Sequence, residues 1–226
     1  MPPATTSPTT SILSRRSRAW WVRVYRALFA LLALISAGMV LSESIGAGRS
    51  TVDFLSYFTI QSNLLAVAVF GWLALAPQSR PTGARRDVLR GGPVLYLAVT
   101  GIVVATLLAG VPVVVNPFAN AVLHQLMPLV VVADWLIEPP GPDLSFRRAL
   151  AWLLFPLVWL TYTMIRGAVT GWYPYPFLDP GTMGGYLSVA AVVVGIVAGG
   201  VALIWLIAWM GRLSHSLWTG GEPTTP

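Results

Sequence analysis

The sequence predicts an all-α integral membrane protein, a six-transmembrane-helix bundle with both termini cytoplasmic. Three observations lead to this prediction. Hydrophobic residues make up 56% of the 226 residues and charged residues only 10%, a balance unlike that of soluble globular domains. Six apolar stretches have the roughly 20 residues that a helix needs to cross a bilayer. Most arginines lie before or at the start of the first stretch, in or beside every second connection, and after the last stretch. This arrangement puts them on one side of the membrane, as the positive-inside rule describes.

The predicted spans follow one another through short connections. Residues 1–19 form a basic N-terminal tail that is expected to be disordered, because it begins with Pro, Ser and Thr. The transmembrane domain covers residues 20–210, and residues 211–226 form a cytoplasmic C-terminal tail. Apolar runs between charged and Pro/Gly boundaries place the spans at Trp20–Leu41, Val52–Ala76, Leu89–Val111, Pro117–Ile137, Phe146–Gly167 and Met183–Met210.

The arginine distribution sets the orientation. With a cytoplasmic N-terminus, twelve of the 14 basic residues lie on the inner side, and only Arg49 and Arg166 lie on the outer side. The same asymmetry accounts for the net charge of +6, so no nucleic-acid partner is expected. Lysine-free, Arg- and Ala-rich usage suggests a high-GC bacterial source, and therefore a multi-pass protein of the bacterial inner membrane.

Several function classes are disfavoured by what the sequence lacks. With no cysteine and two histidines, a disulfide framework, an iron–sulfur cluster, a thiol nucleophile and most transition-metal sites are excluded. We therefore expect no metal and no cofactor. The sequence has no G-x-S-x-G, H-E-x-x-H, P-loop or G-x-G-x-x-G motif, which disfavours a serine-elbow hydrolase, a zinc protease and nucleotide-driven transport.

The second span carries an unusual concentration of polar residues. Thr59 and Asn63 are predicted to share one helix face with Ser56, with Ser62 beside them, while Gln61 lies on the opposite side, paired with residue 57 one turn away. Polar groups inside a membrane are costly and often functional. The alternative is that the hydroxyls only bond to the preceding turn and help helices pack.

The fourth span carries the only intramembrane histidine, His124. Asn120 lies one turn before it and is placed to orient its ring. Pro128 has no amide hydrogen to donate to the His124 carbonyl, so the helix is predicted to kink there. The alternative is a structural histidine bonded to a neighbouring helix.

Thr59 and His124 are predicted to share a layer of the membrane. Each lies about seven residues below the outer boundary of its span, roughly 10 Å at 1.5 Å per residue. A threonine hydroxyl beside an imidazole is a nucleophile–base pair suited to ester cleavage, and burial favours the neutral imidazole that a base requires. Candidates to bind the oxyanion or the substrate are Ser62, Asn63, Gln61, Asn120, Gln125, Tyr162 and Arg166.

A carboxylate to orient His124 is hard to find in the sequence. Asp134 lies about 15 Å farther along the same helix, and we expect it to pair with an inner arginine. Asp53 and Asp179 lie near the outer boundary and are placed to approach from above. The working hypothesis is a dyad oriented by Asn120.

The connection at residues 171–180 alternates aromatic residues with prolines, which precludes a helix. Such a segment can form a stiff cap over a cavity. An ordinary belt of aromatic residues at the membrane interface is the alternative.

Together these residues resemble the six-span androgen-induced and androgen-dependent protein family, in its bacterial branch that carries prolines around the helices. The resemblance is carried by the run Phe-Thr-Ile-Gln-Ser-Asn-Leu-Leu at 58–65, by Asn120-x-x-x-His124 with Pro128, by Asp-Trp-Leu at 134–136 and by Tyr-Pro-Tyr-Pro-Phe-Leu-Asp at 173–179. It covers roughly residues 20 to 210. This sequence differs from the animal members around the threonine, in its basic N-terminus and in its aromatic loop.

The resemblance implies an activity and two residues. Animal members of the family are membrane hydrolases of fatty acid esters of hydroxy fatty acids that use a threonine nucleophile and a histidine, which implies Thr59 and His124 here. The expected partner is then a membrane lipid or related acyl ester.

Two other functions stay open: a non-catalytic lipid-binding or small-molecule transport protein, with Arg166 and the aromatic loop holding a headgroup, and an assembly partner for another membrane complex. The sequence leaves the oligomeric state open.

Overall fold

The computed structural model describes residues 8–76, 83–111, 116–141 and 144–219, and the side chains among them from Trp20 to Ser214. The described chain is entirely helical, and six of its helices are long and apolar enough to cross a membrane. The predicted multi-pass helical fold is therefore confirmed. These spans are Trp20–Gly46, Phe58–Leu75, Ala84–Thr106, Pro117–Ile137, Phe146–Thr170 and Tyr186–Ser214.

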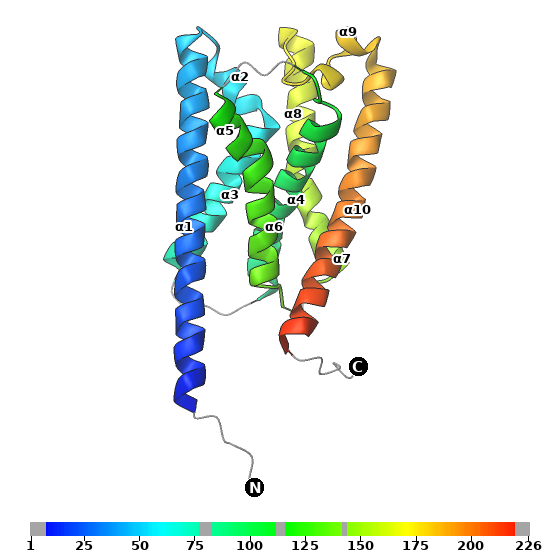
Figure 1. Ribbon diagram of the computed structural model, residues 1–226. Helices are drawn as coiled ribbons and strands as arrows, with labels where there is room; N and C mark the ends of the chain where they lie inside the picture. The colour runs from blue at the N-terminus through cyan, green and yellow to red at the C-terminus, as the bar shows by residue number, and fades with distance from the viewer. Residues whose placement is uncertain (1–7, 77–82, 112–115, 142–143, 220–226) are drawn as a thin grey trace.

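The fourth and fifth crossings are built from several elements, whereas each of the others is a single helix (Figure 1). The first three are α1 (Pro8–Gly46), α3 (Phe58–Leu75), preceded by the short α2 (Thr51–Ser56), and α4 (Ala84–Thr106). The fourth is a continuous run of α5 (Pro117–Ala121), the π-helix η1 (Val122–Leu126) and α6 (Met127–Ile137). The fifth comprises α7 (Phe146–Ala149), the 3₁₀ turn η2 (Leu150–Leu153) and α8 (Leu154–Thr170), and the sixth is α10 (Tyr186–Thr219), preceded by η3 (Pro176–Leu178) and α9 (Pro180–Met183).

Helix α1 begins and α10 ends at the same end of the bundle, as Figure 1 shows. We call this the terminal end, and we call the opposite end, which carries α2 and α9, the distal end. The fourth span was predicted at Pro117–Ile137, and the structure gives it the same bounds. The helices at the two ends of the chain are longer than predicted: α1 already starts at Pro8, within the tail predicted to be disordered, and α10 continues to Thr219. Residues 1–7 and 220–226 of the two predicted tails lie outside the described residues.

The second crossing differs from the single helix predicted over Val52–Ala76. Tyr57 has an extended backbone (φ −68°, ψ 130°) and separates α2 from α3. A continuous helix would have paired the Thr59 amide with the Leu55 carbonyl. Instead, Gln61 Nε2 donates to Leu55 O at 2.8 Å, and Trp159 Nε1 donates to Ser56 O at 2.9 Å. Tertiary contacts thus satisfy the backbone groups that the break exposes.

The tightest packing involves α4 and the fourth crossing. Leu97, Met127 and Trp135 are at most 1% exposed. In contrast, only 17% of the α10 span and 22% of the α7–α8 span are buried, and the apolar side chains left exposed there suit contact with lipid. Helices α8 and α10 therefore form the more open side of the bundle.

Candidate functional site

Thr59 lies in the first turn of α3 and is 4% exposed. Its backbone N–H donates to Tyr175 Oη at 3.3 Å, and its Oγ1 lies 3.4 Å from the same oxygen. Burial raises the pKa of Tyr175 to about 12, so this phenol is neutral at physiological pH. Because the phenol oxygen already accepts a hydrogen bond from the Thr59 amide, its own hydrogen is free to be donated to an oxygen nearby.

Thr59 and Tyr175 are among the residues that line an apolar cavity of about 100 Å³. The cavity lies between α3, α4, α8 and α10, and Tyr175, Phe177 and Leu178 of the connection before α9 form part of its wall. Among the described residues, no charged side chain lines it, and the hydroxyl of Thr100, which also lines it, donates to Tyr96 O at 3.0 Å. Three residues of the segment thus line the cavity, but the expectation that it precludes a helix is wrong, because Pro176–Leu178 form a 3₁₀ turn that a proline can begin.

A close contact holds this cap against α8. A Cβ added to Gly167 of α8 would overlap the Tyr173 ring, so only glycine leaves room for the ring at this position. Asp179 accepts hydrogen bonds from Gly181 N and Thr182 Oγ1, and these lower its pKa. We call residues 171–180 the roof loop.

His124 lies in the π-helix of the fourth crossing. The Met127 amide bonds to Val122 O, five residues back, so the predicted distortion around His124 is confirmed as a π-helical turn. The ring Nδ1 lies 3.1 Å from the Asn120 carbonyl oxygen. Since a carbonyl oxygen only accepts, Nδ1 carries the hydrogen and Nε2 keeps its lone pair. Asn120 therefore orients the ring, through its main chain.

The structure brings the segments of Thr59 and His124 together through Asn63. Asn63 Nδ2 donates to Thr59 O at 2.9 Å and to Leu123 O, next to His124, at 3.1 Å. Among the residues that the structure describes, no hydrogen bond joins the Thr59 hydroxyl to the His124 ring, and His124 does not line the cavity. The nucleophile–base contact thus stays a prediction.

The other residues proposed from the sequence fall into two groups. Two lie near Thr59 with buried polar atoms: the Ser62 hydroxyl and Asn63 Oδ1 have no hydrogen-bond partner in the described part of the chain. Gln61 is engaged with a backbone carbonyl, and Gln125 is exposed on the helix surface. Neither of these two amides is directed at Thr59 by a hydrogen bond.

Tyr162 and Arg166 lie along α8 toward the distal end. The Tyr162 hydroxyl is 2.9 Å from Ser56 Oγ. Arg166 pairs with Asp53 at 2.5 Å and lies over the Trp172 ring at 4.6 Å. Asp53 and Asp179 are therefore occupied by other partners, and neither supplies the carboxylate that a histidine triad would need.

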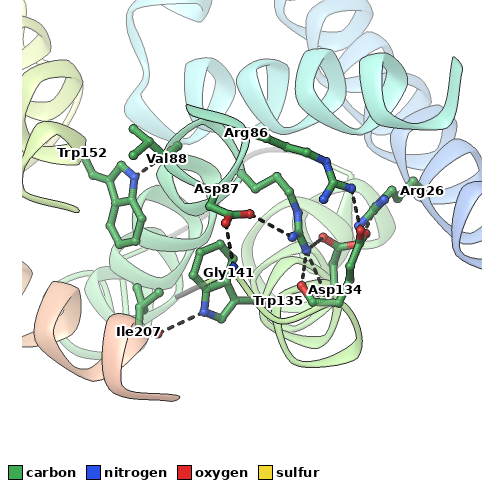
Figure 2. Close-up of polar contacts among 11 residues, drawn as sticks. Arg26, Arg86, Asp87, Val88, Asp134, Trp135, Gly141, Trp152 and Ile207 are labelled. Atoms are coloured by element: carbon green, nitrogen blue, oxygen red, sulfur yellow. Dashed lines mark hydrogen bonds and ion pairs between the residues drawn. The ribbon is translucent and has the colours of Figure 1, made fainter. Parts of the chain in front are cut away.

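Asp134 belongs to an ion cluster near the terminal end, of which Figure 2 shows the contacts. It bonds Arg26 at 2.6 Å and Arg90 at 3.1 Å, which confirms that Asp134 pairs with arginine. Glu138 pairs with Arg26 at 2.5 Å and with Arg86 at 2.6 Å. Burial opposes the ionisation of Glu138, but the positive charges of Arg90, Arg26 and Arg86 outweigh it and lower its pKa to about 2.

The cluster joins three crossings into one unit. Arg26 comes from α1 and Arg90 from α4, while Asp134 comes from α6. Asp87 accepts from the Gly141 amide at 2.8 Å, and Arg90 also lies 5.5 Å from the centre of the Trp135 ring. Figure 2 shows these side chains converging between the helices. Removing one partner from such a buried pair costs about 3–5 kcal/mol, so the cluster holds the terminal end together.

Tyr175 is the site residue that the sequence reasoning left out. It lies 116 positions from Thr59 in the chain, and no local pattern pairs them. The signal that pointed to it was the aromatic and proline-rich composition of the roof loop.

No family model, no curated protein and no solved structure matches the chain.

Proposed function

We propose that the protein is an intramembrane lipid ester hydrolase in which Thr59 is the nucleophile and His124 the base. The observation that carries this proposal is the position of the Thr59 hydroxyl, beside a neutral phenol at the wall of an otherwise apolar cavity. The resemblance to the androgen-induced six-span family adds the substrate class: fatty acid esters of hydroxy fatty acids or related acyl esters. The arginine asymmetry of the sequence supports cytoplasmic termini in a bacterial inner membrane, which turns the distal end outward.

The proposed reaction starts with the acyl chain in the cavity and the ester carbonyl beside Thr59. The Thr59 hydroxyl attacks the carbonyl carbon while its proton passes to His124 Nε2, which requires the imidazole to reach Thr59 in the loaded site. The carbonyl electrons move to oxygen, and Tyr175 Oη–H is placed to donate to that oxyanion. The alcohol leaves with the proton from His124, and water then hydrolyses the acyl-threonine.

The test measures fatty acid released from acyl esters by the purified full-length protein in detergent. Thr59→Ala and His124→Ala should each lower kcat by about 10²–10⁴-fold. Thr161→Ala is the matched control, because this exposed hydroxyl only donates to Leu157 O at 2.9 Å. Hydrolysis at the wild-type rate in both folded site variants would refute the proposal.

A non-catalytic lipid-binding protein is the second candidate. Two observations favour it: the hydroxyl partner of Thr59 is Tyr175, and no charged side chain lines the cavity. In that case fatty acids would bind to the purified protein, but no ester would be turned over, and Thr59→Ala would change binding only modestly.

A further inference from the structure

The cavity has one long apolar axis. Its lining residues extend over Leu153–Leu160 on the fifth crossing and Val193–Gly200 on α10, about 10 Å of helix on each side at 1.5 Å per residue. On α4 they extend from Leu95 to Val104, about 14 Å, and Leu108 lies just beyond the end of this helix. One leaflet of a bilayer has about 15 Å of hydrocarbon, half of the roughly 30 Å core. The lining residues thus extend over most of the depth of one leaflet.

The width of the cavity admits one chain. Its volume of about 100 Å³ is smaller than the roughly 150 Å³ of an apolar cavity that holds a benzene ring. With less room than a cavity that holds benzene, it accommodates only a few methylene groups of one hydrocarbon chain, and a longer chain has to displace lining side chains. Tyr175 belongs to the roof loop and its hydroxyl lies 3.4 Å from that of Thr59, so a carbonyl or carboxyl head placed beside them would find hydrogen-bond donors.

Leu157 of α8 lies between the cavity and the outer surface of the bundle. Leu157 lines the cavity and is also 45% exposed on the surface of the bundle. One side chain therefore separates the cavity from the bilayer at this level. A chain from the membrane can enter sideways by displacing Leu157.

The deep end of the cavity is closed by two residues. The fifth crossing runs toward the distal end and α10 runs away from it (Figure 1), so Leu153 and Gly200 are the lining residues farthest from the roof on each helix. A Cβ added to Gly200 would lie 4.0 Å from Leu153 Cδ2, an ordinary contact. A larger side chain at Gly200 would therefore fill the deep end without moving the backbone.

We propose that the cavity is a site for a single acyl chain and that Leu153 and Gly200 set the longest chain that it accepts. The assignment of the head to Thr59 and Tyr175 rests on the proposed function, whereas the chain site requires no turnover. Leu153 and Gly200 limit the chain length by filling space at the deep end. A longer chain is excluded because its end meets these two residues before its head reaches Thr59.

The test uses free saturated fatty acids of increasing length, each with a terminal diazirine, on the full-length protein in detergent. Affinity is measured by competition, and the crosslinked residues are mapped by mass spectrometry. Gly200→Leu should weaken binding of the longest accepted chain by about tenfold and leave short chains unchanged, whereas Leu153→Ala should admit longer chains. Gly199→Leu is the matched control, because Gly199 is exposed and a Cβ there meets nothing within 4 Å.

The outcomes separate this inference from the hydrolase proposal, because a free fatty acid has no ester to cleave. A changed length preference in Gly200→Leu but not in Gly199→Leu supports the chain site, even if Thr59→Ala leaves ester hydrolysis unchanged. The same length preference in all variants with unaltered melting temperatures would overturn it. Crosslinks confined to the outward face of α10, such as Leu187 and Val194, would also overturn it.

Discussion

The contact between Thr59 and Tyr175 joins a helix start to the roof loop. The break at Tyr57 leaves the Thr59 amide without the carbonyl that a continuous helix would provide, and Tyr175 Oη accepts from it. The same phenol oxygen lies beside the Thr59 hydroxyl. One tyrosine therefore both satisfies a backbone donor and adds a neutral hydrogen-bond donor next to the proposed nucleophile.

Tyr175→Phe tests both roles. It leaves the buried Thr59 amide without an acceptor, so the free energy of unfolding should fall by about 1–3 kcal/mol. If the phenol also donates to the oxyanion, kcat should fall by about 10²–10³-fold with KM little changed. Chemical denaturation in micelles and steady-state kinetics on an acyl ester measure the two effects.

Tyr57→Phe is the control for this prediction. The Tyr57 ring packs edge-on against Trp172 and Tyr175, but within the described chain its hydroxyl makes no hydrogen bond, so the variant should retain stability and kcat. Because both variants keep their rings, equal losses would show that removing either hydroxyl has the same effect, and would contradict a specific role for the hydrogen bonds of Tyr175.

At the scale of an element, the π-helix in the fourth crossing depends on a missing amide. Because the Met127 amide bonds to Val122 O, the donor that would follow for Leu123 O in π-helical spacing is residue 128, a proline without N–H. Asn63 Nδ2 from α3 supplies the hydrogen bond instead. We call this replacement of the missing proline amide by Asn63 Nδ2 the exchange. It links the distorted turn that contains His124 to α3, the helix of Thr59.

A double-mutant cycle between Asn63 and Pro128 tests this account. Asn63→Leu should lower the free energy of unfolding by about 1–3 kcal/mol, because a buried carbonyl loses its donor. In a Pro128→Ala background the loss should be smaller, since the substituted alanine provides an amide to the same carbonyl. Additive losses, measured by chemical denaturation, would contradict the exchange.

The elements differ in how far the sequence predicts them. The fourth crossing was predicted with its bounds, because Pro117 suits a helix start and Pro128 forces a distortion. The break at Tyr57 was missed, since no Gly or Pro marks it and the partners that stabilise it, Trp159 and Tyr175, are distant in sequence. Charge patterns predicted the pairing of Asp134. Pairing of Thr59 with Tyr175 depends on how the loop folds back, which local patterns do not encode.

At the scale of the whole molecule, polar groups divide between the two ends of the bundle. The hydroxyl groups beside the cavity carry no charge, whereas arginines and carboxylates form the ion cluster near the terminal end and the Arg166–Asp53 pair toward the distal end. Among the described residues, α8 and α10, which border the cavity, contribute no side chain to the ion cluster.

The ion cluster predicts an acid-sensitive stability. Arginines lower the pKa of Glu138 in the folded protein to about 2, while an unfolded glutamate has a pKa of about 4.3. The stabilisation is therefore fully present above about pH 5 and is lost as the pH falls toward 2. Glu138→Gln should lower stability at neutral pH and flatten the dependence below about pH 5. Denaturation midpoints across this range measure it, and an unchanged acid profile in the variant would contradict the role of Glu138.

The most direct test of the central claim is to locate a covalent adduct. The full-length protein is incubated with an alkyl fluorophosphonate, and the modified peptide is identified by mass spectrometry. The account predicts one phosphonyl group on Thr59, none in Thr59→Ala and slower labelling in His124→Ala. An adduct on another residue, or labelling of Thr59→Ala at the wild-type rate, would contradict it.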